Sequence, residues 1–160
     1  MGQYRRSRNI ESSLIDYLST ALTADGWSGI RTCKSLTQVY DGEVPAILIY
    51  VQDTDTQKRE VGGNIYLKFP TVYIRIFAEN DGQRLDLADW ILEKLEVVSL
   101  PYYQYTITNG VVSAKVLKGN IVIRSINRNE KELANTQPDT LDEEDRYRHL
   151  IELSCFIGEI

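Results

Sequence analysis

The chain is constrained most by residues 72–90, where a strand pattern runs through an Asp-Gly pair directly into a helix pattern. Apolar side chains first occupy every second position, which is typical of a strand with one buried face. These positions are Val72, Ile74, Ile76 and Ala78. We expect Asp81 to cap a helix whose apolar side chains then recur at helical spacing. They are Leu85, Ala88, Leu92 and Leu95. The segment lacks a phosphate-binding glycine pattern and a nucleophile elbow, so it predicts a scaffold.

One more helix and several more strands follow from the same kinds of pattern. The first helix is predicted to begin at Ser7 or Asn9, either of which suits a cap, and to end before Gly26. Its apolar stripe consists of Ile10, Leu14, Leu18, Ala21 and Leu22. Further strands are predicted over residues 35–40, 46–51, 65–69, 104–108, 111–116, 120–126 and 147–157, with a turn at residues 109–110. Strands and helices do not alternate regularly. The order therefore predicts an α+β fold, a mostly antiparallel sheet with both helices packed on one face.

Three polar segments interrupt these patterns. Residues 1–8 are basic and predict a flexible N-terminal arm, and residues 52–64 predict a protruding hairpin between two strands. Residues 127–145 hold almost no apolar side chains and include an acidic run. The run consists of Asp142, Glu143, Glu144 and Asp145. Such a composition buries too little surface to order itself, so we expect a long exposed loop.

Composition bounds the size and the class of the protein. A chain of 160 residues with 42% hydrophobic content fits one domain, here residues 1–160. The net charge of −5 argues against binding nucleic acid through bulk electrostatics. The N-terminal sequence lacks the apolar core of a signal peptide, and no apolar run is long enough to cross a bilayer. We therefore expect a soluble protein made in a cytoplasm, with no membrane partner.

Catalytic and metal-binding chemistry finds little support in the sequence. His149 is the only histidine, and it falls mid-strand with no nucleophile motif beside it, although Cys33 or Cys155 could approach it in space. The two cysteines share no metal-ligand spacing and are expected to be reduced and buried. The consecutive carboxylates of residues 142–145 lack the spacing and the glycine of a calcium loop. We expect no enzyme activity, no cofactor and no metal.

The charged clusters are better suited to contacts with partners or with water. Arg5, Arg6 and Arg8 precede the first helix, whose N-terminal dipole disfavours positive charge, so they are expected to serve a partner, an arm or mere solvation. The acidic residues 142–145 are expected to be a solvated loop, and the alternative is a negative surface that repels DNA phosphates. Ten tyrosines against three phenylalanines suit either a protein interface or packing within the sheet.

The order of the elements resembles the tail terminator and tail-completion proteins of tailed bacteriophages. The resemblance spans most of the chain and rests on its pattern, with no catalytic fingerprint. It comprises an N-terminal helix, the strand PAILIYV, the hairpin at residues 52–64, the strand VYIRIFA, the helix DLADWIL and the closing strand RYRHLIELSCF. Head–tail connector and neck proteins share much of this outline.

This resemblance implies a structural virion protein that is assembled in the host cytoplasm. Its copies would form a ring, expected to be a hexamer, that stacks on the last ring of the tail-tube protein and ends its polymerisation. The opposite face of the ring would meet the head connector or a neck protein, and DNA would pass through the lumen without specific binding. On this interpretation, Lys58, Arg59 and Glu60 of the hairpin form ion pairs between subunits, and the acidic loop is a candidate lining of the lumen.

Three alternatives remain open on the sequence. The protein could be a neck or head-completion protein, which differs from a terminator in what it touches more than in its fold. It could be a small enzyme that uses His149 with a nearby cysteine or carboxylate. It could also be an adaptor that binds a peptide along a sheet edge.

Overall fold

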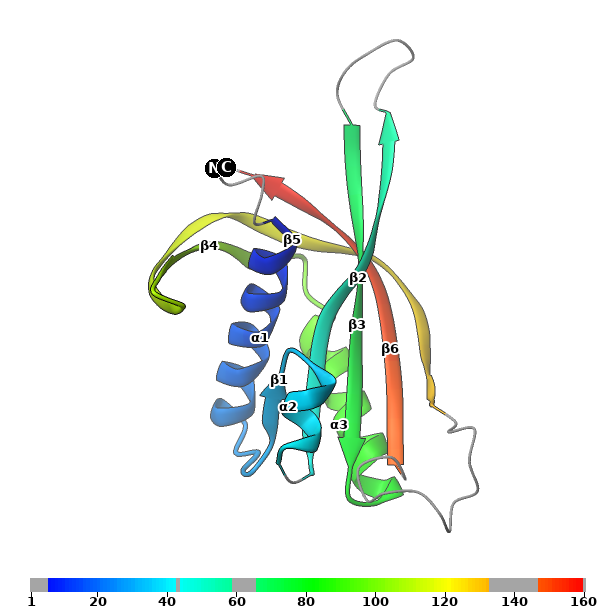
Figure 1. The fold of residues 1–160 in the computed structure, drawn as a ribbon. Helices are drawn as coiled ribbons and strands as arrows, with labels where there is room; N and C mark the ends of the chain where they lie inside the picture. Colours follow the sequence, from blue (N-terminus) through cyan, green and yellow to red (C-terminus); the bar gives the residue numbers. More distant parts are fainter. Residues whose placement is uncertain (1–5, 43, 59–65, 133–146, 160) are drawn as a thin grey trace.

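A curled six-stranded sheet runs through the computed structural model, which describes residues 6–42, 44–58, 66–132 and 147–159 (Figure 1). In chain order the elements are α1 (Arg6–Ala24), β1 (Arg31–Cys33), α2 (Leu36–Tyr40), β2 (Ala46–Lys58), β3 (Tyr66–Ala78), α3 (Asp81–Leu95), β4 (Leu100–Thr108), β5 (Val111–Lys131) and β6 (Tyr147–Glu159). The strand order is β1-β2-β3-β6-β5-β4, and every pair is antiparallel except β1 with β2. This confirms the predicted α+β fold with a mostly antiparallel sheet.

The main core lies between the sheet and the two long helices, which pack on the same face as predicted. The alternating face of β3 is fully buried there, together with Ile10, Leu14 and Leu18 of α1. In the same stripe Leu22 is buried and Ala21 is partly buried. In α3 the buried stripe is centred on Leu87 and Ile91, whereas Leu85 is 46% exposed. The expectation that Leu85 belongs to the buried stripe was wrong, because the helix is rotated so that its Leu87 and Ile91 side faces the sheet.

The short helix α2 covers part of the opposite face of the sheet. Val39 of α2 packs there with Leu48 and Phe77 in a second, smaller buried cluster. Residues 35–40 were expected to form a strand, and this was wrong for a local reason. The Ser35 side chain accepts a hydrogen bond from the backbone N–H of Gln38 and caps a helix at that point. Serine followed by glutamine three residues later is the sequence pattern of such a cap.

Helix α1 touches the backbone of both outer parts of the curled sheet. Toward β4, the hydroxyl of Ser13 accepts a hydrogen bond from the Tyr103 N–H at 3.0 Å, and the amide oxygen of Asn9 accepts one from the Tyr105 N–H at 3.4 Å. Toward β2, the carboxylate of Glu11 accepts a hydrogen bond from the Val51 N–H at 2.9 Å. Polar side chains of one helix thus satisfy backbone donors that an edge strand would otherwise expose.

The sheet forks at Pro70. The ladder between β3 and β6 ends where Thr71 pairs with Ser154, and beyond it β3 pairs only with β2, while β6 pairs only with β5. Proline has no N–H to donate to a ladder and is tolerated where a strand becomes an edge. The β2–β3 hairpin therefore leaves the sheet as a separate arm, which rises above it in Figure 1.

Several observed boundaries of strands and helices differ from the predicted ones. The strands expected at residues 111–116 and 120–126 are one strand, β5, which continues to Lys131 because its second half pairs with β6. Residues 127–131 therefore belong to the sheet and not to the expected loop. Helix α1 begins at Arg6, so the expected arm and the expected caps Ser7 and Asn9 overlap the helix. The cap of α3 is Asn80, one residue before the expected Asp81.

Replacement of Ser13 by alanine tests whether α1 protects the sheet edge. Ser13 is buried, so Ser13→Ala leaves the Tyr103 N–H without its acceptor. We expect the free energy of unfolding to fall by about 1–3 kcal/mol in urea denaturation. The neighbouring Ser12 accepts a hydrogen bond only from the exposed Lys34 ammonium group, so Ser12→Ala should change it by less than about 0.5 kcal/mol. Equal effects of the two substitutions would contradict this role of Ser13.

Candidate functional site

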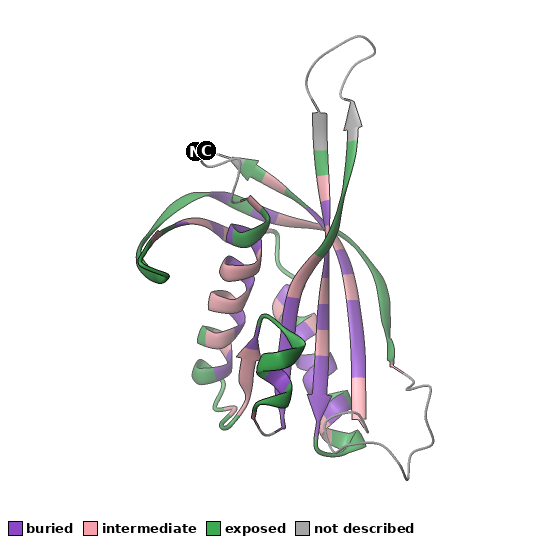
Figure 2. Ribbon diagram, in the orientation of Figure 1, coloured by how far each residue is buried: buried purple, intermediate pink, exposed green. Residues whose placement is uncertain are grey.

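The β2–β3 arm is the segment for which the sequence predicted partner contacts. Lys58 is the last residue of β2, whereas Arg59 and Glu60 lie outside the described residues. On the described part of the arm, residues 52–56 and Lys68 are exposed (Figure 2). A two-stranded hairpin is marginally stable alone in water, so an exposed arm of this kind is suited to contact with another molecule.

The predicted charged clusters fall partly outside the described residues. Arg5 and the acidic residues 142–145 lie outside them. Arg6 and Arg8 lie in the first turn of α1 and not in a preceding arm. Arg6 lines a shallow pocket with Thr54, Lys68 and other residues at the base of the β2–β3 arm. One of the predicted basic residues is thus brought next to the predicted arm.

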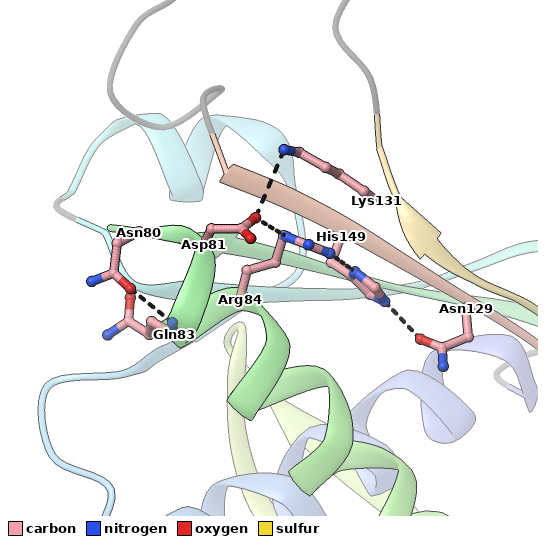
Figure 3. A network of polar contacts seen from close by, with 7 residues as sticks. All are labelled: Asn80, Asp81, Gln83, Arg84, Asn129, Lys131 and His149. Carbon is pink, nitrogen blue, oxygen red and sulfur yellow. Dashed lines mark hydrogen bonds and ion pairs between the residues drawn. The ribbon is translucent and has the colours of Figure 1, made fainter.

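His149 is the centre of a buried polar network at the opposite end of the sheet (Figure 3). Its Nδ1 lies 2.6 Å from a guanidinium nitrogen of Arg84, and its Nε2 lies 2.6 Å from the amide oxygen of Asn129. Arg84 also donates to the carboxylate of Asp81 at 2.9 Å, and Lys131 lies 3.7 Å from the same carboxylate oxygen. The network therefore joins α3, the end of β5 and the start of β6.

The network fixes the protonation state of the histidine. A guanidinium group can only donate, so Nδ1 of His149 must accept, and Nε2 must carry the proton that is donated to Asn129. Burial of the imidazole lowers the pKa of His149, and the positive charge of Arg84 lowers it further. The arginine in turn pairs with Asp81, the pKa of which is lowered chiefly by its hydrogen bond to Arg84.

This geometry bears on the possible use of His149 as a catalytic base. Both ring nitrogens already have partners, and only 5% of the residue is exposed. Cys155 lies six positions further along β6, about 20 Å away at the rise of a strand. Cys33 packs in the cluster on the opposite face of the sheet. Neither thiol lies beside the imidazole, and both are buried as predicted.

The partners of His149 did not follow from the sequence patterns. Arg84 is a buried arginine in the polar-looking first turns of α3, and Asn129 lies in a segment that was expected to be a loop. The available signal was the alternation along the last strand. His149 lies two and four residues before the buried Ile151 and Leu153, so its side chain points to the same face of the sheet, toward the helices. A buried histidine needs polar partners.

The face of the sheet away from the long helices carries aromatic and charged side chains. The guanidinium group of Arg75 lies within 6 Å of the ring centres of Tyr50 and Tyr73. Glu132 lies 3.7 Å from Arg75 and 3.1 Å from Arg148, which stacks over Phe77. The half-exposed tyrosines on this face thus have partners within the chain.

The tyrosines around β4 pack largely inside the protein. Tyr102 and Tyr105 are buried, and the hydroxyl of Tyr105 donates to Asp16 at 2.6 Å. Burial and this carboxylate raise the pKa of Tyr105. Packing within the monomer therefore accounts for these two side chains.

No described helix is both long and apolar enough to cross a membrane. Within the described ranges, no three side chains of His, Cys, Asp or Glu gather in a way that could hold a metal ion.

Titration of the single histidine tests the network directly. We expect the imidazole signals in NMR spectra of the folded protein to report a pKa below the ordinary value of 6.5. Arg84→Met removes the positive charge and the donor at Nδ1, so it should raise this pKa. Lys131→Met removes a charge that contacts only Asp81 in the network, so it should change the pKa much less. A wild-type pKa at or above 6.5 would contradict the geometry.

The same lowered pKa sets a direction for stability. The unfolded chain binds a proton at His149 at a higher pH than the folded chain does. The contribution of His149 to stability is therefore complete above about pH 6.5 and is lost as the pH falls from 6.5 through the lower pKa of the folded protein. Urea denaturation of the wild type and of His149→Gln over this range measures the effect, which should be absent in the variant.

Comparison with known proteins adds no relative to this description. No protein-family model matches the chain, and no curated protein matches it either.

Proposed function

We propose that this protein is a structural subunit of a tailed bacteriophage that forms a ring, expected to be hexameric, at the head-proximal end of the tail. There it would end polymerisation of the tail tube and join the tail to the head connector. The proposal rests on the resemblance of the element order to tail terminator and tail-completion proteins. It is supported by an α+β core from which a hairpin arm projects.

The observation that carries the proposal is the exposed arm. Beyond Pro70, β2 and β3 pair only with each other, and residues 52–56 of the arm are exposed. A monomeric protein gains little from extending a narrow hairpin into water, because the exposed strands bury little apolar surface. A subunit that must grip its neighbours does gain from it. Lys58, Arg59 and Glu60, at or beyond the end of β2, remain our candidates for ion pairs between subunits.

The proposal also assigns a role to charge. A ring through which DNA passes must not retain it, and the net charge of −5 favours repulsion of phosphates over binding. Asp142, Glu143, Glu144 and Asp145 are our candidates for the lining of the lumen. The virion, with assembly in the host cytoplasm, is the proposed location.

The enzyme alternative is weakened by the surroundings of His149. A general base needs a free nitrogen within reach of the proton that it removes, whereas both nitrogens of His149 are held by Arg84 and Asn129. We therefore assign His149 a structural role and propose a protein without catalytic activity.

Tail length in particles assembled without this protein tests the proposed function. A phage that carries the gene would be produced with the gene deleted, and its particles would be examined by electron microscopy. We expect overlong tails that are not joined to heads, because nothing would cap the growing tube. Supplying the gene from a plasmid should restore tails of uniform length.

Normal-length tails beside unattached heads would overturn the terminator assignment and move the protein to the neck. Unchanged, infectious particles would overturn a structural role altogether and favour the adaptor or enzyme alternatives.

A complementation experiment separates the structural role from catalysis. Plasmid-borne His149→Gln lacks an imidazole but can keep a hydrogen bond within the network. We expect it to restore joined tails to within about a fewfold of wild-type yield, provided that the variant is folded by circular dichroism. Complete failure of a folded variant would contradict the structural role of His149.

A further inference from the structure

We propose that copies of this chain join through the two strand edges that separate at the fork, with β3 of one copy pairing with β6 of the next. The inference deepens the proposed ring and takes its biological setting from that function. It identifies the partner of the arm as a second copy of the same chain and specifies the contact.

The fork leaves two backbone edges of equal length without a neighbour among the described strands. β3 continues beyond the shared ladder through residues 66–70, and β6 continues through residues 155–159. The first segment pairs only with β2 and the second only with β5. Each segment therefore presents one row of backbone donors and acceptors that no described strand pairs. Such an edge is a template for an additional strand.

The two edges match each other in direction and in side chains. In the ladder, Thr71 pairs with Ser154 in an antiparallel arrangement, and extending this register by two residues would place Phe69 opposite Phe156. Phe156 is 39% exposed, and the guanidinium group of Arg124 lies 4.4 Å from the ring centre of Phe69. Aromatic side chains that face each other across an antiparallel pair of strands stabilise the pair. The guanidinium group of Arg124, stacked on Phe69 of one copy, would be covered by Phe156 of the next copy.

These edges cannot pair within one chain as it is folded. The two strands diverge beyond the pair of Thr71 with Ser154. In Figure 1 the β2–β3 arm rises, whereas the end of β6 turns away from the arm and stays paired with β5. A thiol hydrogen bond from Cys155 to the Pro70 carbonyl, 3.6 Å long, occupies the point of divergence. A second copy can provide each edge with the strand partner that it lacks among the described strands of its own chain.

The resulting contact is head-to-tail. Every copy has one β3 edge and one β6 edge, so each copy can engage two neighbours through different surfaces. Contacts of this kind generate closed rings when the rotation between copies closes, and filaments when it does not. Helix α1 covers the β2 edge at Val51 and the β4 edge at Tyr103 and Tyr105, so these positions are not available to a further strand.

Disulfide capture between two different variants tests the contact. One purified protein would carry Phe69→Cys and the other Phe156→Cys, so only contact between copies can bring these two cysteines together. Directly facing residues of an antiparallel pair have their Cα atoms about 4.5–5.5 Å apart, within the range that a disulfide requires. The native Cys33 and Cys155 are buried, and burial raises the pKa of Cys155 to about 12, so they contribute little background.

We expect a disulfide-linked heterodimer when the two variants are mixed at high concentration with oxidised glutathione and analysed on a non-reducing gel. The matched control mixes Phe156→Cys with Val98→Cys, whose side chain is 93% exposed in the connection from α3 to β4. The control should give at least tenfold less heterodimer.

No heterodimer, or as much with Val98→Cys as with Phe69→Cys, overturns the proposed contact. Binding of the fork by a peptide of another protein would give the first of these results. The contact needs only copies of this chain, so this outcome is independent of the tail-length experiment. A ring whose copies join through other surfaces would give no heterodimer in the disulfide experiment, whereas deletion of its gene would still give overlong tails.

Discussion

Hydrogen bonds between the polar side chains of α1 and the outer strands hold the curled sheet in its shape. Asn9 and Ser13 point from one side of the helix to β4, and Glu11 points from the other side to β2. The apolar stripe of the same helix fills the space between the strands. Since these donors would otherwise be exposed at the margins of the sheet, the helix shapes the fold and also prevents strands from being added at those positions.

The distribution of covered and uncovered edges connects the fold with the proposed assembly. Where α1 contacts β2 and β4, backbone donors at the margins of the sheet are satisfied within the chain. At Pro70, in contrast, two strands separate and present edges that no described strand pairs. An uncovered edge is a liability unless it has a partner, so natural proteins seldom leave one without a use. The proposed ring gives both edges such a use.

Sequence patterns predicted those elements whose burial is periodic. The alternating face of β3 and the stripe of α1 were identified correctly, because period-two and helical patterns reflect which side of an element meets the core. Residues 127–131 at the end of β5 were missed, because Arg128 and Glu130 lie on the exposed sheet face and look locally like a loop. Helix α2 was missed, since a helix of five residues is defined by its cap at Ser35 more than by periodicity.

The candidate sites were predictable only in outline. The protruding arm followed from a polar stretch with glycines between two strands, but the fork did not, because it depends on where β6 stops pairing with β3. The network at His149 needed knowledge of three elements that meet in space. Arg84 and Asn129 are 45 residues apart in the chain, and nothing in either local sequence marks them as neighbours of one histidine.

The burial of His149 also determines how the outside of the protein responds to its medium. Histidine is the side chain that ordinarily changes charge near neutral pH, and the only one in this chain is enclosed and neutral. Both thiols are buried with raised pKa values. Within the described residues, neither the imidazole nor the thiols therefore change the charge of the surface near neutral pH. Ionic strength, not acidity, would then be the variable by which solution conditions adjust contacts between its charged surfaces.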